Sequence, residues 1–278
     1  RTEGSYSDGR HPDSVAFVPD LREDLARRDF TINAMAYSAE EGLCDPFGGR
    51  EDLARGVVRA VGEPLRRFGE DALRILRLYR FAARFGFAID EATEAAAKQL
   101  ASHLDCVSAE RIEEELNKLL AAPQPGAYLE PEVLAFVLPE LPPEELTKAR
   151  RWIDALPAGT EQVSARWAAL LMPLGETGAR KALKRLKCSN ARIDGAAALV
   201  RECGEKTPDT LDKCDLRLQA KRLLGKYDLH TVQQLTALWT ALAPEEKASF
   251  DALRAEAEAL TAQGVCCRIS QLAVNGRD

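Results

Sequence analysis

The side chains best suited to chemistry are a group of arginines between residues 59 and 84. The first lysine is Lys98, so every lysine or arginine position before it is an arginine. A guanidinium is a planar fork of donors that fits phosphates and base edges, whereas an ammonium is a point charge. The composition indicates anion binding, with a coding bias toward arginine as the alternative. The group consists of Arg59, Arg66, Arg67, Arg74, Arg77, Arg80 and Arg84.

Four of these arginines recur at helical spacing within residues 70–84. At about 100° per residue they fall within an arc of about 120°. Like charges at this spacing repel by a few tenths of a kcal/mol, so the row is mildly costly unless an anion lies in front of it. The pattern predicts a helix with one cationic and one packed face. The cationic face carries Arg74, Arg77, Arg80 and Arg84, and the packed face carries Ala72, Ile75, Leu76, Tyr79, Ala82 and Ala83.

Asp71 and Arg74 stand three residues apart at the start of this predicted helix, which places an acceptor beside a fork of donors. Adenine and cytosine each offer an exocyclic amine beside a ring acceptor. Guanine and uracil instead present donors where Arg74 needs an acceptor. The pair is therefore suited to reading a nucleobase edge. An ordinary intrahelical salt bridge on a solvated face is the alternative.

A second charged group, Arg27, Arg28 and Asp29, comes directly before an apolar run that contains a single asparagine. An aspartate at the start of a helix accepts backbone N–H bonds, and an arginine beside it is well placed to hold an anion. The alternative interpretation is a surface ion pair with Asp29 as a simple helix cap.

These groups need a scaffold, and the sequence predicts an α+β fold that is mostly α. The first 55 or so residues combine an extended pattern at 15–18, a helix-like stretch at 24–37 and a turn at 45–49. After Gly56 the strand signals nearly vanish, and the remainder is predicted to be helical. The clearest predicted helices cover residues 70–85, 90–104, 108–123, 131–141 and 143–156.

The composition of the 278 residues, 46% hydrophobic and 29% charged, is typical of a globular protein with a sizeable core. No apolar run approaches the roughly 20 residues that a membrane helix requires, so the sequence predicts no membrane partner and a cytosolic location. The seven cysteines are odd in number and include no CxxC pair. They are expected to be reduced, mostly buried thiols, and a zinc site is not expected.

Several motifs, in register, resemble one known family. The segments are RRDFTINAMAY at 27–37, DPFGG at 45–49, GEDALRILRLYRFAARFGF at 69–87 and SAERIEEELNKLL at 108–120. They are similar to successive motifs of the class II tRNA nucleotidyltransferases (CCA-adding enzymes) and bacterial poly(A) polymerases. The resemblance implies the last part of a polymerase-β-like head at 1–55, a helical neck that recognises the nucleotide base at 56–125, and a helical, RNA-binding body with the start of a tail at 126–278.

The resemblance also implies roles for particular residues. Arg28 would contact the triphosphate of the incoming nucleotide, Asp71 and Arg74 would pair with the base of CTP or ATP, and Arg77 and Arg80 would continue the nucleotide-binding face. The implied reaction adds CMP and AMP from CTP and ATP to the 3′ end of tRNA. Two Mg²⁺ ions would align the RNA hydroxyl and the α-phosphate.

In that family, the phosphate loop and the Asp-x-Asp metal ligands precede the strand with which this chain begins. No catalytic residue or metal ligand is therefore assigned within the chain, the Mg²⁺ ligands are expected upstream, and the chain is expected to be catalytically incompetent alone. The alternatives are a poly(A) polymerase, an enzyme that adds only CC or only A, and a non-catalytic RNA-binding helical module. The sequence leaves the oligomeric state open.

Overall fold

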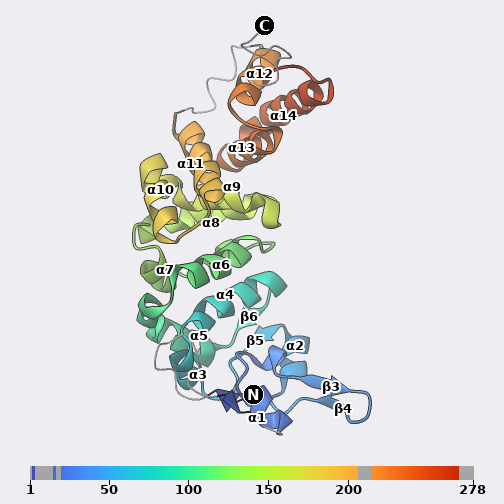
Figure 1. The fold of residues 1–278 in the computed structure, drawn as a ribbon, viewed down its shortest axis with the longest axis vertical. Helices are drawn as coiled ribbons and strands as arrows, with labels where there is room; N and C mark the ends of the chain where they lie inside the picture. The colour runs from blue at the N-terminus through green and yellow to red at the C-terminus, as the bar shows by residue number, and fades with distance from the viewer. Residues whose placement is uncertain (1, 4–14, 17–19, 206–214, 269–278) are drawn as a thin grey trace. The chain divides into compact units, whose positions relative to one another are not determined.

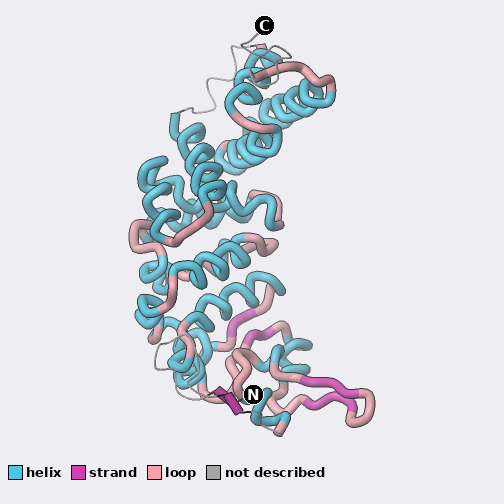
Figure 2. The backbone as a smooth tube through the Cα atoms, viewed as in Figure 1, coloured by secondary structure: helices cyan, strands magenta, loops and turns pink. Residues whose placement is uncertain are grey.

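The computed structural model describes residues 2–3, 15–16, 20–205 and 215–268 of the chain (Figure 1). The chain forms two compact units, Arg1–Ser108 and Ala109–Asp278. The three-part division predicted from the sequence, with boundaries after residues 55 and 125, stays a prediction. The predicted α+β class with a large excess of helix is confirmed, because strands are short and helices fill most of the described chain (Figure 2).

The amino-terminal unit mixes short strands with helices. Its described strands form three two-stranded sheets: β1 with β2 and β3 with β4 are antiparallel, whereas β5 with β6 is parallel. The strands are β1 (Thr2–Glu3), β2 (Val15–Ala16), β3 (Ala36–Ser38), β4 (Gly42–Cys44), β5 (Val57–Val58) and β6 (Ala88–Ile89). The helices are α1 (Leu21–Ala26), α2 (Gly49–Arg55), α3 (Pro64–Glu70), α4 (Leu73–Phe85) and α5 (Glu91–Gln99), with 3-10 turns η1 (Thr31–Asn33) and η2 (Ala101–Cys106).

Two strands after Gly56, β5 and β6, were not expected from the sequence. Each has only two residues, so neither leaves an alternating pattern that periodicity can detect. Their parallel pairing joins Val57 to Ala88 across the intervening helices α3 and α4. This non-local pairing brings the start of α3 and the end of α4 to one small sheet.

The prediction of a helix-like stretch over residues 24–37 is wrong beyond Ala26. There α1 ends, Phe30 is extended, and η1 and then β3 follow. Besides local bonds, the backbone here bonds to the segment at 59–61: Thr31 N donates to Arg59 O at 2.9 Å, and Val61 N donates to Asp29 O at 3.1 Å. We call residues 26–30 the arginine loop, because it carries Arg27 and Arg28.

The predicted turn at residues 45–49 is confirmed and starts α2. Gly48 has a φ of 74°, which favours glycine, and both carboxylate oxygens of Asp45 accept from backbone N–H groups at the helix start, those of Gly49 and Arg50. A Cβ at Gly49 would lie 2.1 Å from Thr31 O, so the close approach of α2 to η1 requires glycine there.

The carboxy-terminal unit is helical, with no strand among its described residues. Its apolar core includes Trp167, Leu170, Leu199, Leu235 and Leu253. The α-helices are α6 (Ala109–Leu120), α7 (Pro131–Val137), α8 (Leu146–Ala155), α9 (Val163–Leu171), α10 (Gly175–Arg185), α11 (Asn190–Glu205), α12 (Leu216–Lys226), α13 (Leu229–Leu242) and α14 (Lys247–Ala262). The 3-10 turns are η3 (Gly126–Tyr128), η4 (Pro143–Glu145), η5 (Thr160–Gln162), η6 (Met172–Leu174) and η8 (Pro244–Glu246).

Two general expectations can be compared with the structure. No described helix is both long enough and apolar enough to cross a membrane. The six described cysteines are free thiols, but the expectation that most are buried is wrong, because among them only Cys188 is buried and Cys106 and Cys266 are exposed. Burial raises the pKa of the Cys188 thiol to about 12, with Glu113 adding to the shift. Cys214 lies outside the described residues.

Arg166 of α9 is completely buried and bonds to backbone carbonyls at the ends of two other helices. Its guanidinium donates to the carbonyls of Leu120 and Ala122, which follow the last turn of α6. It also donates to Leu156 O at 2.8 Å, directly after α8. Carbonyls at helix ends lack partners within their own helix, so one side chain satisfies several such groups.

Replacing Arg166 with methionine is expected to lower the free energy of unfolding by about 3–5 kcal/mol, because several buried carbonyls would lose their donors. Urea unfolding monitored by circular dichroism measures the change. The control is Arg151→Met on α8, an exposed arginine whose loss should cost less than about 0.5 kcal/mol. Equal effects of the two substitutions would contradict the structural role given to Arg166.

Candidate nucleotide-binding site

A break between α3 and α4 shapes the candidate site. The prediction of a continuous helix through residues 70–84 is wrong at its start, because Asp71 is extended, with φ −153° and ψ 103°. Asp71 Oδ1 instead accepts from Leu73 N at 3.1 Å, at the beginning of α4. Asp71 and Arg74 therefore stay close along the chain, but they do not form the intrahelical i, i+3 pair expected from the sequence.

Arg74 forms an ion pair with Glu70, the last residue of α3. Arg74 Nη1 lies 2.9 Å from Glu70 Oε2, and it also donates to Arg67 O at 3.0 Å. Its Nη2 donates to Arg27 O in the arginine loop at 3.1 Å. Arg74 thus connects the break between the helices to a segment that is 47 residues away in the sequence.

Arg67 makes a parallel connection from α3. Its Nη1 lies 2.6 Å from the same Glu70 oxygen, its Nη2 donates to Ala26 O at 2.8 Å, and its Nε donates to Val61 O at 3.2 Å. Burial lowers the pKa of Arg67, and the charge of Glu70 opposes the shift. The group remains a cation at neutral pH.

Arg77, one turn after Arg74, forms an ion pair with Asp29, at 2.5 Å between Nη2 and Oδ2. The other oxygen of Asp29 accepts from Phe30 N at 3.0 Å and from Asn33 Nδ2 at 3.1 Å. Burial by itself raises the pKa of Asp29, but the charge of Arg77 and these hydrogen bonds outweigh it, so the pKa lies below its usual value. Asp29 is thus a buried anchor for the arginine loop rather than a simple helix cap.

Arg80 and Arg84 differ from the first two arginines of the row. The guanidinium of Arg80 is buried over the ring of Phe81, 4.0 Å from its centroid, whereas Arg84 is exposed and lies 5.6 Å from the centroid of Phe85. Arginine stems and planar heads pack well against aromatic faces. The predicted fully cationic face of α4 is therefore wrong, because part of it is covered, while the predicted packed face is buried except for half-buried Ala72.

Arg28 is more exposed than Arg74 and Arg77, the other two predicted site residues that form the ion pairs described above. Its side chain is 56% exposed and reaches Asp24 Oδ2 at 3.5 Å. Burial raises the pKa of Asp24, but the charges of Arg27 and Arg28 and the hydrogen bond from Arg28 together help to outweigh it, so the pKa lies below its usual value. A long, exposed pair of this kind is weak, so a stronger anion can displace it.

The structure thus places four of the five predicted site residues around one segment. Arg74 and Arg77, both on α4, contact the loop that carries Arg28. Asp71 lies just before α4 and accepts from Leu73 N, at the start of that helix. Arg80 lies over the ring of Phe81. Sequence analysis did not single out Arg67 or Glu70 as site residues, although their i, i+3 spacing is a signal for the ion pair that they form.

No group of three or more His, Cys, Asp or Glu side chains gathers at metal-binding distance in the described part of the chain. No Mg²⁺ ligand is assigned among the described residues, and no chemical step is derived through the Mg²⁺ ions that the resemblance implies.

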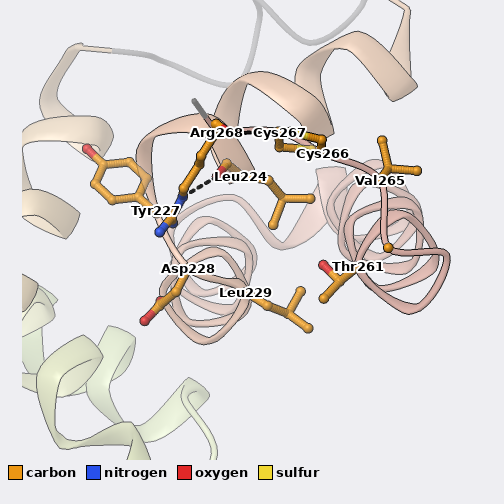
Figure 3. A pocket seen from close by; sticks show the side chains of 10 residues that line it. Leu224, Tyr227, Asp228, Leu229, Thr261, Val265, Cys266, Cys267 and Arg268 are labelled. Atoms are coloured by element: carbon orange, nitrogen blue, oxygen red, sulfur yellow. Dashed lines mark hydrogen bonds between the residues drawn. The ribbon is translucent and has the colours of Figure 1, made fainter. Parts of the chain in front are cut away.

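A separate pocket of about 270 Å³ lies in the carboxy-terminal unit and contains none of the predicted site residues (Figure 3). Arg268, at its edge, donates from Nε to Leu224 O at 2.9 Å, as the dashed line in Figure 3 shows. Asp228 caps α13 through Thr231 N. Because these charged groups serve helix ends, the pocket does not present the cluster of cations that a triphosphate requires.

Comparison with known proteins decides the family. Two family models match, "Poly A polymerase head domain" over residues 1–59 and "Probable RNA and SrmB- binding site of polymerase A" over residues 86–142. The chain is 42% identical over 208 residues to the CCA-adding enzyme of Geobacillus stearothermophilus, covering 72% of this chain and 50% of that enzyme. The chain belongs to the CCA-adding enzyme family.

Other members of the CCA-adding enzyme family agree with this assignment. The CCA-adding enzyme of Limosilactobacillus fermentum is 40% identical over 221 residues, which cover 78% of this chain and 55% of that enzyme. The crystal structure of the Bacillus stearothermophilus CCA-adding enzyme in complex with CTP matches with a TM-score of 0.74 at 32% identity, over 94% of this chain and 64% of that one. The chain spans about half the length of the curated relatives that it matches.

The substitution Asp29→Asn tests the buried anchor. It is expected to lower the free energy of unfolding by about 2 kcal/mol at neutral pH, because Arg77 loses a charged partner. A carboxylate whose pKa is depressed by folding stabilises the fold above its unfolded pKa of about 3.9, and that contribution is lost as the pH falls through the folded pKa. The difference in the free energy of unfolding between the substituted and unsubstituted chains should therefore be constant near neutral pH and shrink in acid.

Urea unfolding at a series of pH values measures this difference. Glu51→Gln is the matched control, because Glu51 pairs with Arg55 on α2 and both side chains are 65% exposed. That substitution should change the free energy of unfolding by less than about 1 kcal/mol at any pH. A penalty for Asp29→Asn that persists undiminished in acid would contradict the ionised state of Asp29.

Proposed function

We propose that this chain is the nucleotide-selecting and RNA-binding part of an RNA nucleotidyltransferase that adds CMP and AMP from CTP and ATP to tRNA 3′ ends. The residues proposed to bind the nucleotide are Arg28, Asp71, Arg74, Arg77 and Arg80. The proposal extends to this chain the activity named for its relatives, the CCA-adding enzymes. A cytosolic location stays a prediction from the sequence.

The observation that carries the proposal is the contact between the start of α4 and the arginine loop. Arg74 donates to Arg27 O, and Arg77 binds Asp29, so Arg28 stands between two residues held by α4. A nucleotide needs cations for its triphosphate and a paired donor and acceptor for its base, and these elements meet here within one compact unit.

The charge balance of this cluster favours an anion. Arg67 and Arg74 share one carboxylate oxygen, Glu70 Oε2. Arg27 and Arg28 likewise share Asp24. Because Arg66 also pairs with Glu70, three arginines face Glu70 and two face Asp24. Positive charge therefore remains that a triphosphate is able to neutralise.

In the proposed base contact, Asp71 accepts from an exocyclic amine while Arg74 donates to the adjacent ring acceptor. The guanidinium of Arg74 has more N–H donors than its three hydrogen bonds use. Its position is fixed by these bonds before any nucleotide arrives. A donor fixed in advance discriminates between bases better than a mobile one, because a mismatched base cannot draw it into a new geometry.

Poly(A) synthesis is the second candidate activity. The family models that match residues 1–59 and 86–142 are described for poly(A) polymerases. Such an enzyme would select ATP alone, whereas CCA addition needs both CTP and ATP. The identity of the product separates the two activities.

Nucleotide binding to the chain tests the proposed site. Arg74→Ala is expected to weaken CTP and ATP binding by about 1–3 kcal/mol and to leave the weaker binding of GTP and UTP almost unchanged. Isothermal titration calorimetry with the four nucleotides measures this. Arg84→Ala on the same helix is the control, because Arg84 is exposed and lies over Phe85. Equal losses for all four nucleotides, or for both substitutions, would support a non-catalytic RNA-binding module instead.

The product test uses a chimaera in which this chain follows the part of the G. stearothermophilus CCA-adding enzyme that precedes the matched region. With Mg²⁺, CTP, ATP and a tRNA transcript that ends before its CCA, the chimaera is expected to add CCA, and sequencing of the RNA ends identifies the product. A run of adenosines would assign the chain to the poly(A) polymerases. No extension in any nucleotide mixture, from a folded chimaera, would overturn the proposed function.

A further inference from the structure

We propose that Arg67 is a positioning residue that sets the distance between the triphosphate-binding Arg28 and the base-reading Arg74. Arg67 would touch neither part of the nucleotide. It would act by holding the arginine loop against the break between α3 and α4. This inference rests on the proposed function, because it assigns a role within that nucleotide site.

The contacts of Arg67 carry the inference. Its side chain is only 10% exposed, and its three nitrogens bond to three different segments. They reach Ala26 O in the arginine loop, Val61 O in the segment that precedes α3, and Glu70 at the end of α3. A planar fork is able to bridge three directions at once, whereas a lysine ammonium on a flexible stem is not held in one plane.

Glu70 links Arg67 to the base-reading residue. The same oxygen, Oε2, accepts from Arg67 at 2.6 Å and from Arg74 at 2.9 Å. The two arginines then donate to consecutive carbonyls of the loop, Ala26 O and Arg27 O. A shift of Arg67 would therefore move the loop and the guanidinium of Arg74 relative to each other.

The loop is fixed from its other end as well. Asp29 O accepts from Val61 N, and Thr31 N donates to Arg59 O. Arg28 lies between this end and the carbonyls held by Arg67 and Arg74. The side chain of Arg28 is exposed, but the backbone is anchored on both sides of it, so these bonds set the position from which the side chain extends toward a triphosphate.

Arg66 provides a matched comparison. It is the neighbouring residue on α3 and also pairs with Glu70, at 3.3 Å from Oε1, but its side chain is 80% exposed. The bonds to the carbonyls of Ala26 and Arg27 come from Arg67 and Arg74, whereas Arg66 pairs with Glu70. Conservative replacement of the two arginines therefore separates positioning of the loop from the loss of a charge beside Glu70.

The experiment compares Arg67→Lys with Arg66→Lys by titration of CTP, ATP, GTP and UTP into the folded chain. Arg67→Lys is expected to weaken CTP and ATP binding roughly tenfold, as losing an outer partner of a binding group does elsewhere, and to reduce the preference for CTP over UTP by a similar factor. Arg66→Lys should change neither quantity by more than about twofold. A substitution that only destabilised the fold would lower the active fraction and leave the preference between CTP and UTP unchanged.

The outcomes separate this inference from the proposed function. If the unsubstituted chain binds no nucleotide, the proposed function fails. If it binds CTP and ATP selectively and Arg74→Ala abolishes the selectivity, but Arg67→Lys behaves like Arg66→Lys, the positioning role is overturned and the proposed function survives. If Arg67→Lys weakened the binding of all four nucleotides equally, the positioning role would also be overturned.

Hydrogen exchange of the unsubstituted chain tests the inference even if Arg67→Lys does not fold. The inference requires an arginine loop that is ordered before nucleotide binds, so the amides of Arg28, Phe30 and Thr31 are expected to exchange slowly without nucleotide. Addition of CTP should slow them little further. Fast exchange that becomes slow only with CTP would show that the nucleotide orders the loop, and Arg67 would not be its positioning residue.

Discussion

The structure of the candidate site depends on buried guanidinium groups that bond to backbone carbonyls. Arg67 and Arg74 bond to the carbonyls of Ala26, the last residue of α1, and Arg27, the residue that follows it. A loop without internal hydrogen bonds is costly to bury. Side-chain donors from α3 and α4 remove that cost and fix the loop, and Arg166 does the same for helix ends in the other unit.

Carboxylates lie beside the arginines of the candidate site and pair with them. Glu70 accepts from two arginines, and Asp29 is the buried partner of Arg77. Each carboxylate lowers the cost of placing cations side by side without cancelling their combined charge. The site is therefore organised before a ligand arrives, which favours selective binding because little further ordering is required.

Family membership and the geometry of the candidate site are consistent with each other, but the chain matches only part of its relatives. The relatives are about twice as long as the match, and the described residues of this chain hold no metal-binding cluster. Within one unit of this chain, the arginine loop contacts the helix that carries Arg74 and Arg77. In the proposed function, this contact selects the nucleotide.

The sequence by itself determined the mostly helical fold, the helix that carries Arg74 and Arg77, the turn at Asp45–Gly49 and the family, because these depend on local spacing and on motifs in order. Only the tertiary structure decided which arginines are buried. The extended Phe30 and the β5–β6 pair lie where the backbone bonds to segments about 30 residues away, and the helix break at Asp71 is closed by a local bond from Leu73 N. Periodicity reports which face of a helix is apolar, but it contains no information about which distant carbonyl or carboxylate a guanidinium will meet.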